Sequence, residues 1–224
     1  MSVSTPGPRV GVITFPGSLD DGDALRAVEL MGGVGVPLWH ADRDLRGVDA
    51  IVLPGGFSYG DYLRCGAIAR FAAVMEEVVA FAGRGGPVLG ICNGFQILCE
   101  AGLLPGVLRP NRTLSFICRQ VTLEIDDAAT AWTGGLPSGA TRSIPIKNHD
   151  GAWYGDPGDG RVVFRYDESN PTGAYDRVAG IANRDGNVLG MMPHPECACD
   201  ALVGSADGRV LFDSLVTTPS LSAA

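Results

Sequence analysis

The segment spanning residues 86–101 constrains the fold more than any other part of the sequence. Gly86-Pro87-Val88-Leu89 is typical of a turn followed by a short buried strand, and residues 93–101 are typical of a helix. Between them lies Gly90-Ile91-Cys92-Asn93-Gly94, the Gly-x-nucleophile-x-Gly pattern of a nucleophile elbow. The dipole of a following helix would stabilise a thiolate at this position. The segment predicts a strand–turn–helix unit with Cys92 as a nucleophile; the alternative is a buried, inert cysteine in a glycine-rich turn.

Strands and helices alternate through the first half of the sequence. Apolar strands are expected at 9–14, 36–39 and 49–53, with helices around 25–31 and over 67–82. The second of these helices has an apolar face formed by Phe71, Val74, Val78 and Phe81. Near-continuous apolar strands joined by helices predict an α/β fold, with a central, mainly parallel sheet covered on both faces, as in flavodoxin-like proteins.

The second half is richer in strands. Short strands are expected at 121–125, 161–166, 178–182 and 188–192, with a hairpin turn at 185–187 and a last helix at 208–215. No repeat or linker divides the sequence. We therefore expect a single domain over 1–224, with flexible ends at 1–8 and 217–224.

Composition excludes several classes of protein. The net charge is −8 and no basic run is present, so nucleic acid is not expected as a main partner. No apolar run approaches membrane-spanning length, and the N-terminus does not resemble a secretory signal. The six cysteines are therefore expected to be reduced, and the protein to be cytoplasmic without a membrane partner.

A cysteine nucleophile needs a base, and the sequence offers three histidines. His194 follows an apolar strand, and Glu196 lies two residues further on, where an extended segment would place both side chains on one side. Glu196 would then hold the imidazole in the correct tautomer while His194 accepts the thiol proton. His149, next to Asp150, is the rival base, whereas His40 is interpreted as structural.

An oxyanion hole is expected from the loop Pro54-Gly55-Gly56-Phe57, at the carboxyl end of the strand over 49–53. The N–H of Gly56 would be one donor. The N–H of Asn93, the residue after the nucleophile, would be the other. Gln96 lies one helical turn after the nucleophile, on a side of the helix that can face a substrate.

No metal or cofactor is predicted. Cys197 and Cys199 form a Cys-x-Cys pair, but no second pair has the spacing of zinc ligands. A phosphate-binding loop of the Gly-x-x-x-x-Gly-Lys kind is absent from the sequence, so the chain is not expected to bind ATP itself.

Three motifs together carry a family resemblance. Pro-Gly-Gly-Phe-Ser at 54–58, Gly-Ile-Cys-Asn-Gly-Phe-Gln at 90–96 and His-Pro-Glu at 194–196 occur in this order. In this the sequence resembles the class I, triad-type glutamine amidotransferases. It is most similar to the glutaminase subunits of phosphoribosylformylglycinamidine synthase, and the resemblance covers nearly the whole chain.

The resemblance implies an activity and a set of roles. Such a subunit hydrolyses glutamine to glutamate and ammonia. The ammonia goes to an ATP-dependent synthetase subunit, accompanied by a small accessory subunit, which converts formylglycinamide ribonucleotide to formylglycinamidine ribonucleotide in purine biosynthesis. The resemblance implies a catalytic triad made of Cys92, His194 and Glu196. It implies an oxyanion hole made of the N–H groups of Gly56 and Asn93. It also implies a glutamine-binding site that contains Gly55, Phe57 and Gln96.

One segment departs from the family pattern. Where such subunits usually carry Gly-Glu-Gly before an aromatic residue, this chain has His149-Asp150-Gly151 before Trp153, so partner docking or regulation is expected to differ. We also expect slow hydrolysis without a partner, because the Gly55-Gly56 peptide is flexible. Two alternatives stay open: a class I subunit that feeds a different synthetase, and a non-catalytic redox or binding module. Release of glutamate from glutamine separates an enzyme from such a module.

Overall fold

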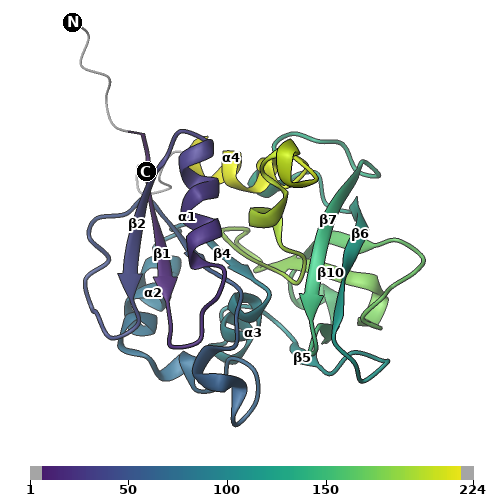
Figure 1. The fold of residues 1–224 in the computed structure, drawn as a ribbon, viewed down its shortest axis with the longest axis horizontal. Coiled ribbons are helices and arrows are strands. Elements are labelled where there is room, and N and C mark those ends of the chain that lie inside the picture. The colour runs from purple at the N-terminus through teal and green to yellow at the C-terminus, as the bar shows by residue number, and fades with distance from the viewer. Residues whose placement is uncertain (1–6, 218–224) are drawn as a thin grey trace, which may run out of the picture.

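The computed structural model describes residues 7–217 and is built around one large mixed sheet (Figure 1). Within these residues the sheet has nine strands in the order β2-β1-β3-β4-β11-β10-β9-β6-β7, and β5 pairs separately with β8. The strands are β1 (Arg9–Thr14), β2 (Val34–Trp39), β3 (Ala50–Leu53), β4 (Val88–Ile91), β5 (Val107–Arg109), β6 (Ile117–Ile125), β7 (Thr141–Asn148), β8 (Ala152–Tyr154), β9 (Arg161–Tyr166), β10 (Val178–Ala182) and β11 (Val188–Met191). Most of the flexible ends expected from the sequence lie outside the described residues.

Four α-helices are present in the described part of the chain: α1 (Asp21–Leu30), α2 (Ala73–Gly83), α3 (Asn93–Glu100) and α4 (Arg209–Thr217). Short 3-10 turns are η1 (Ser58–Asp61), η2 (Ala69–Phe71), η3 (Ala131–Thr133), η4 (Pro157–Asp159), η5 (Tyr175–Arg177), η6 (Pro195–Ala198) and η7 (Ala201–Val203). None of the described helices is long and apolar enough to cross a membrane.

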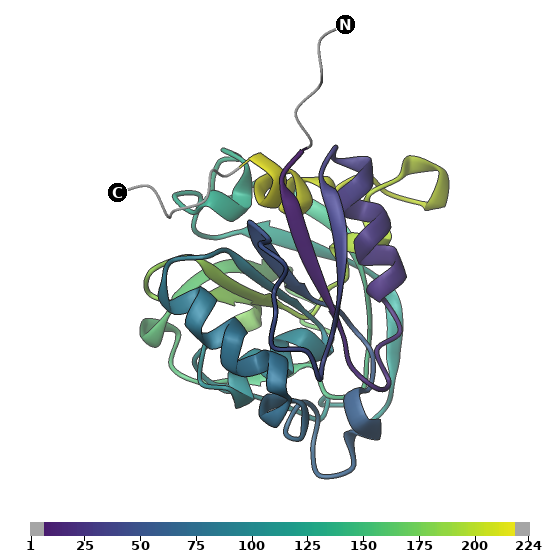
Figure 2. The same cartoon turned by 90° about the vertical axis from the view of Figure 1, so that its left-hand side faces the viewer.

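The first half of the chain forms the parallel part of the sheet. Strands β2, β1, β3, β4 and β11 pair in parallel, and every residue of β3, β4 and β11 is buried. Helix α1 packs on β1 and β2, and α3 packs on β3, β4 and β11. Figure 2 shows α1 and α2 on opposite sides of the strands. The expected α/β fold, with a mainly parallel sheet covered on both faces, is confirmed.

The second half adds the antiparallel part. Strands β10 and β11 form the expected hairpin around Gly186, and β9, β6 and β7 extend the sheet beyond them. The sequence does not predict β7, because Pro145 interrupts it. A proline cannot donate a backbone hydrogen bond and is tolerated on an edge strand, which is where β7 lies.

The prediction of a helix over 67–82 is wrong for the first part of this range. Helix α2 begins only at Ala73, because Ala72 has extended backbone angles (φ −63°, ψ 146°) that separate it from the preceding turn η2. Phe71 is consequently 74% exposed rather than on the apolar face, whereas Val74 and Val78 are buried as expected.

Strand order places three loops at one edge of the sheet. Leu53 pairs with Gly90, and Ile91 pairs with Met191, so β3, β4 and β11 are neighbours that end together. The segments that follow them contain the three sequence motifs. Because parallel strands deliver their following loops to the same edge, residues far apart in the sequence meet there.

Candidate active site

Cys92 occupies a strained turn between β4 and α3. Its backbone angles are φ +51° and ψ −105°, a combination rare for a residue with a side chain. A Cβ atom on Gly94 would lie 2.0 Å from the backbone oxygen of Leu53, and one on Gly90 would lie 2.5 Å from the Leu98 side chain. Both flanking glycines are therefore required by close packing. The geometry is that of a nucleophile elbow, as the sequence predicts.

His194 and Glu196 form a buried pair after β11. The Nδ1 atom of His194 lies 2.5 Å from Oε1 of Glu196, and the backbone N–H of His194 donates to the carbonyl of Pro145 on β7 (2.8 Å). The segment is the 3-10 turn η6 rather than extended, but the two side chains still meet. Burial lowers the pKa of His194, but the nearby Glu196 and Cys92 outweigh this effect and raise it to about 10. Nε2 of His194 is buried and has no hydrogen-bond partner among the described residues, so this ring nitrogen is free to accept a proton.

The Gly55-Gly56 peptide is held in one orientation. The carbonyl of Gly55 accepts hydrogen bonds from the N–H groups of Leu19 (3.1 Å) and Asp20 (3.3 Å). In a trans peptide the N–H points opposite to the carbonyl, so the N–H of Gly56 is directed away from these two residues. Gly56 has φ +147°, and a Cβ there would lie 2.5 Å from the Gly17 oxygen. The structure thus shows one anchored orientation of this peptide, and the slow hydrolysis expected without a partner stays a prediction.

Asn93 joins this loop to the first turn of α3. Its Oδ1 atom accepts from the N–H of Ser58 (3.1 Å), and its Nδ2 donates to Oε1 of Gln96 (2.8 Å). Nε2 of Gln96 donates in turn to the carbonyl of Asp150 (2.7 Å). The backbone N–H of Asn93 is the first of α3, where amide groups lack intrahelical acceptors. Asn93 thus offers a backbone donor beside the nucleophile, and its side chain helps to fix the loop that carries Gly56.

A cavity of about 140 Å³ connects these groups. It is lined by Leu19, Asp20, Gly56, Phe57, Asp61, Cys65, Cys92, Gln96, Phe116, Lys147, Asn148, His149, Asp150 and His194. Gly55 is absent from this lining and lies behind it, where a Cβ would be 2.4 Å from Oδ2 of Asp20 and 2.7 Å from the His194 ring. Of the glutamine-site residues implied by the resemblance, Phe57 and Gln96 therefore reach the cavity. Gly55 makes room for His194.

The other two histidines differ in their surroundings. His149 lines the same cavity, with its Nδ1 atom 3.0 Å from Oδ2 of Asp150 and its side chain 46% exposed. His40 lies 2.6 Å from the hydroxyl of Tyr59 and packs edge-on against Trp39. The structure thus brings the rival base into the cavity but leaves it more open to solvent than His194. His40 belongs to a packed aromatic group.

Two acidic side chains from distant parts of the sequence, Asp61 and Asp150, converge in the cavity. Oδ2 of Asp61 lies 3.3 Å from the Cys65 sulfur, and Oδ2 of Asp150 lies 3.4 Å from it. The pKa of Asp61 is raised above its usual value, mainly by burial and also by the charge of Asp150, although the hydrogen bond from Cys65 lowers it. Oδ1 of Asp61 is buried and has no partner within the described residues. No spacing in the sequence links Asp61 to Asp150, so only the fold reveals the pair.

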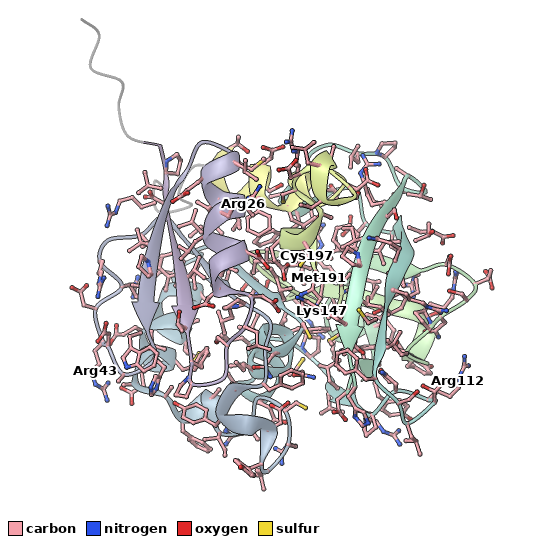
Figure 3. The ribbon with its side chains drawn as sticks, in the orientation of Figure 1. Arg26, Arg43, Arg112, Lys147, Met191 and Cys197 are labelled. Atoms are coloured by element: carbon pink, nitrogen blue, oxygen red, sulfur yellow. The ribbon has the colours of Figure 1, made fainter. Side chains whose placement is uncertain are left out.

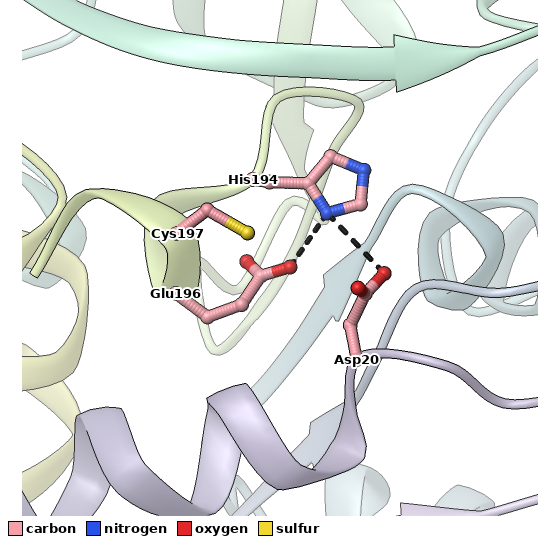
Figure 4. Close-up of side chains that lie close together, drawn as sticks. All are labelled: Asp20, His194, Glu196 and Cys197. Atoms are coloured by element: carbon pink, nitrogen blue, oxygen red, sulfur yellow. Dashed lines mark hydrogen bonds and ion pairs between the residues drawn. The ribbon is translucent and has the colours of Figure 1, made fainter. Parts of the chain in front are cut away.

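A second cluster of side chains that can titrate or bind metal surrounds His194. Asp20, His194, Glu196 and Cys197 present donor atoms within 4.8 Å of one another (Figure 4). Figure 3 shows Lys147 and Cys197 between α1 and β7. Such a donor set can hold a metal ion in principle. Here the Lys147 ammonium already lies 2.5 Å from Asp20, and Glu196 already bonds to His194, so we do not identify these residues as metal ligands.

The chain is similar to known glutamine amidotransferases over most of its length. Residues 7–210 match the family model of the CobB/CobQ-like glutamine amidotransferase domain. The phosphoribosylformylglycinamidine synthase subunit PurQ of Rhodococcus jostii is 57% identical over 216 residues, covering 93% of this chain and 96% of that protein. The PurQ subunit of Mycobacterium tuberculosis H37Rv is also 57% identical, over 92% of this chain and 95% of that protein.

Solved structures show the same relationship. A chain in the structure of PurLQS from Thermotoga maritima superimposes with a TM-score of 0.89 at 42% identity, covering 93% of this chain and 97% of that one. A glutamine amidotransferase from Thermotoga maritima, at 17% identity and a TM-score of 0.59 over 93% of this chain and 90% of that one, shares the fold. The chain belongs to the CobB/CobQ-like glutamine amidotransferase family and, within it, to the PurQ subunits of phosphoribosylformylglycinamidine synthase.

Proposed function

We propose that this chain hydrolyses glutamine at Cys92 and supplies the ammonia to the synthetase subunit of phosphoribosylformylglycinamidine synthase. That subunit converts formylglycinamide ribonucleotide to formylglycinamidine ribonucleotide with ATP, and a small accessory subunit completes the complex. The observation that carries the proposal is the strained Cys92, which shares one cavity with His194, itself bonded to Glu196. Family membership supplies the acceptor reaction.

The geometry supports a two-step acyl transfer. The Cys92 thiolate attacks the side-chain amide carbon of glutamine, and the N–H groups of Gly56 and Asn93 stabilise the oxyanion that forms. His194 takes the thiol proton and gives it to the departing nitrogen, which leaves as ammonia. A water molecule, deprotonated by His194, then attacks the thioester carbon. Glutamate leaves, and the proton returns to the Cys92 sulfur. Glu196 holds the ring of His194 throughout.

Substrate recognition follows from the remaining cavity groups. We infer that Gln96, which bonds to Asn93 and to the Asp150 carbonyl, contacts the substrate amide, and that Phe57 contacts the substrate from another part of the lining. Glutamine also carries an α-ammonium group. We assign this group to the carboxylates of Asp61 and Asp150, because they converge in the cavity and one Asp61 oxygen lacks a partner in the described structure.

Replacing Asp150 with Asn is expected to raise KM for glutamine about 10-fold or more while leaving kcat largely unchanged. The variant removes one charge-assisted hydrogen bond of about 1.5–3 kcal/mol, which corresponds to roughly 10- to 100-fold in affinity. It preserves the backbone carbonyl that holds Gln96. Steady-state glutamate release measures both constants, with exposed Asp185→Asn as the control. An unchanged KM for Asp150→Asn would remove Asp150 from the substrate site.

The mouth of the cavity supports a docked partner. Leu19, Phe57 and Phe116 line the cavity, yet they are 65%, 43% and 51% exposed. Apolar and aromatic side chains of this kind are typical of the core of a protein–protein interface. A synthetase that covers them would shield the site from bulk solvent and receive the ammonia. We also propose that the enzyme works in the cytoplasm, where the six cysteines, all free thiols in the structure, would stay reduced.

A glutamine-like diazoketone is expected to label Cys92 ahead of the other cysteines. Burial raises the pKa of Cys65, Cys99, Cys197 and Cys199, so their reactive thiolate forms are scarce near neutral pH. Exposed Cys118 lies outside the cavity lining, and Cys118→Ser is the matched control. Peptide mapping by mass spectrometry locates the label. Predominant labelling of Cys65 or Cys197 would refute the assignment of Cys92.

A further inference from the structure

Asp20 stands at the start of α1 but does not cap it. An aspartate at this position normally accepts a hydrogen bond from an amide of the first helical turn, whereas Asp20 makes no such side-chain bond. Its carboxylate is buried and turns toward the catalytic pair instead. Oδ1 lies 2.5 Å from Nζ of Lys147, and Oδ2 lies 3.6 Å from Nδ1 of His194. Figure 4 shows the carboxylates of Asp20 and Glu196 both directed at the same ring nitrogen of His194.

Lys147 balances the charge of Asp20. It comes from β7, 127 residues away in the sequence, and its side chain is one-third exposed. Burial lowers the pKa of Lys147, but the hydrogen bond and the charge of Asp20 outweigh burial and raise it above its usual value. Lys147 is therefore cationic throughout the working pH range. The Asp20–Lys147 pair therefore adds little net charge beside His194, and Glu196 remains the carboxylate bonded to its Nδ1 atom.

The backbone of Asp20 also connects the base to the oxyanion loop. Its N–H donates to the carbonyl of Gly55, which helps to orient the N–H of Gly56. Gly55 has no room for a Cβ because Oδ2 of Asp20 and the His194 ring both occupy that space. A change in the position of Asp20 would therefore alter the positions of both the His194 ring and the Gly56 N–H.

We propose that Asp20 and Lys147 form a positioning pair, in which Asp20 steadies the His194 ring and Lys147 cancels the charge that Asp20 brings to it. The proposal rests on the assignment of Cys92 and His194 as nucleophile and base. Glu196 remains the direct partner of His194. The pair acts through His194 and does not touch the substrate amide.

The sign of the electrostatic effect follows from the surrounding groups. The charged or titratable groups that face His194 are Cys92 just before α3, Glu196 and Cys197 on η6, Asp20 before α1, and Lys147 on β7. The buried Tyr166 of β9 faces Cys92 in turn. The pH limbs of the reaction belong to the site as a whole, because neighbouring groups influence one another's protonation. Removing the Asp20 charge leaves Lys147 unbalanced, which disfavours proton binding at the site and moves both limbs to lower pH. Removing the Lys147 charge leaves Asp20 unbalanced and moves both limbs to higher pH.

The test is a double-mutant cycle followed over pH. Asp20→Asn is expected to shift both limbs of the kcat/KM profile for glutamate release down by about one pH unit. Lys147→Met should shift both limbs up by about one unit, the lower end of the effect of a nearby charge. The double variant should return to within a few tenths of a unit of the wild type. Asp200→Asn and Arg26→Met, from an ion pair that also involves α1 but lies outside the cavity lining, are matched controls.

A second readout keeps the proposal separate from the proposed function. The pH dependence of Cys92 alkylation by iodoacetamide, followed by peptide mass, reports ionisation of the Cys92–His194 pair without requiring glutamine hydrolysis. Its midpoint should move in the same directions. If the wild-type chain releases no glutamate, the glutaminase assignment fails. The pH midpoints of Cys92 alkylation still test the effect of the Asp20–Lys147 pair. Unshifted limbs and midpoints, with lower activity at every pH and no recovery in the double variant, would make the pair a simple structural link and overturn the proposal.

Discussion

The His194→Ala variant is expected to lose glutamine hydrolysis by about a thousand-fold or more. His194 is the one histidine of the cavity that is buried, bonded to a carboxylate and left with an unpartnered Nε2 in the described structure. Removing it takes away the group that accepts the thiol proton and later protonates the leaving nitrogen. Glutamate release by the complex with its synthetase, measured at saturating glutamine, gives the loss in kcat directly.

Two companion variants make the result specific. His149→Ala should keep most of the activity, because His149 is half exposed and pairs with Asp150 rather than with the triad. Glu196→Gln should cost less than His194→Ala, since an amide oxygen can still accept from Nδ1 although its charge is gone. An inactive His149→Ala, with His194→Ala still active, would move the base to the rival loop.

The Cys92→Ser variant is expected to lose glutamine hydrolysis by a similar factor. A serine hydroxyl fits the same strained turn, so the fold should be retained. The hydroxyl is far less acidic than a thiol, so much less of the reactive anion forms at this position near neutral pH. Glutamate release measures the loss, and Cys199→Ser serves as the control. Wild-type turnover in Cys92→Ser would exclude Cys92 as the nucleophile.

The motifs and their order can be predicted from the sequence because each lies at the end of an apolar strand. The elbow at Cys92 needs two glycines at fixed positions, and the structure shows that both are packed too tightly to carry a side chain. The pairing of His194 with Glu196 is predicted for an extended segment. It holds in a 3-10 turn instead, because the turn still places the carboxylate on Nδ1.

The side chains that surround the proposed triad cannot be predicted from local sequence motifs. Asp20 resembles an ordinary helix cap in the sequence, and Lys147 lies on a strand that Pro145 conceals. Their contact depends on the position of β7 at the sheet edge, where the Pro145 carbonyl also holds the backbone of His194. The Asp61–Asp150 pair is likewise a product of tertiary packing. A prediction from local patterns finds the residues that make a turn, but it does not find side chains that meet across the fold.

The most direct test of the account compares nitrogen donors in the complex reconstituted with the partner synthetase. The wild type should make formylglycinamidine ribonucleotide from either glutamine or added ammonium. Cys92→Ser should lose synthesis from glutamine and keep wild-type synthesis from ammonium, because the acceptor site lies on another chain. Equal loss with both donors would show that Cys92 serves the complex structurally, and would contradict the account of this chain as the source of ammonia.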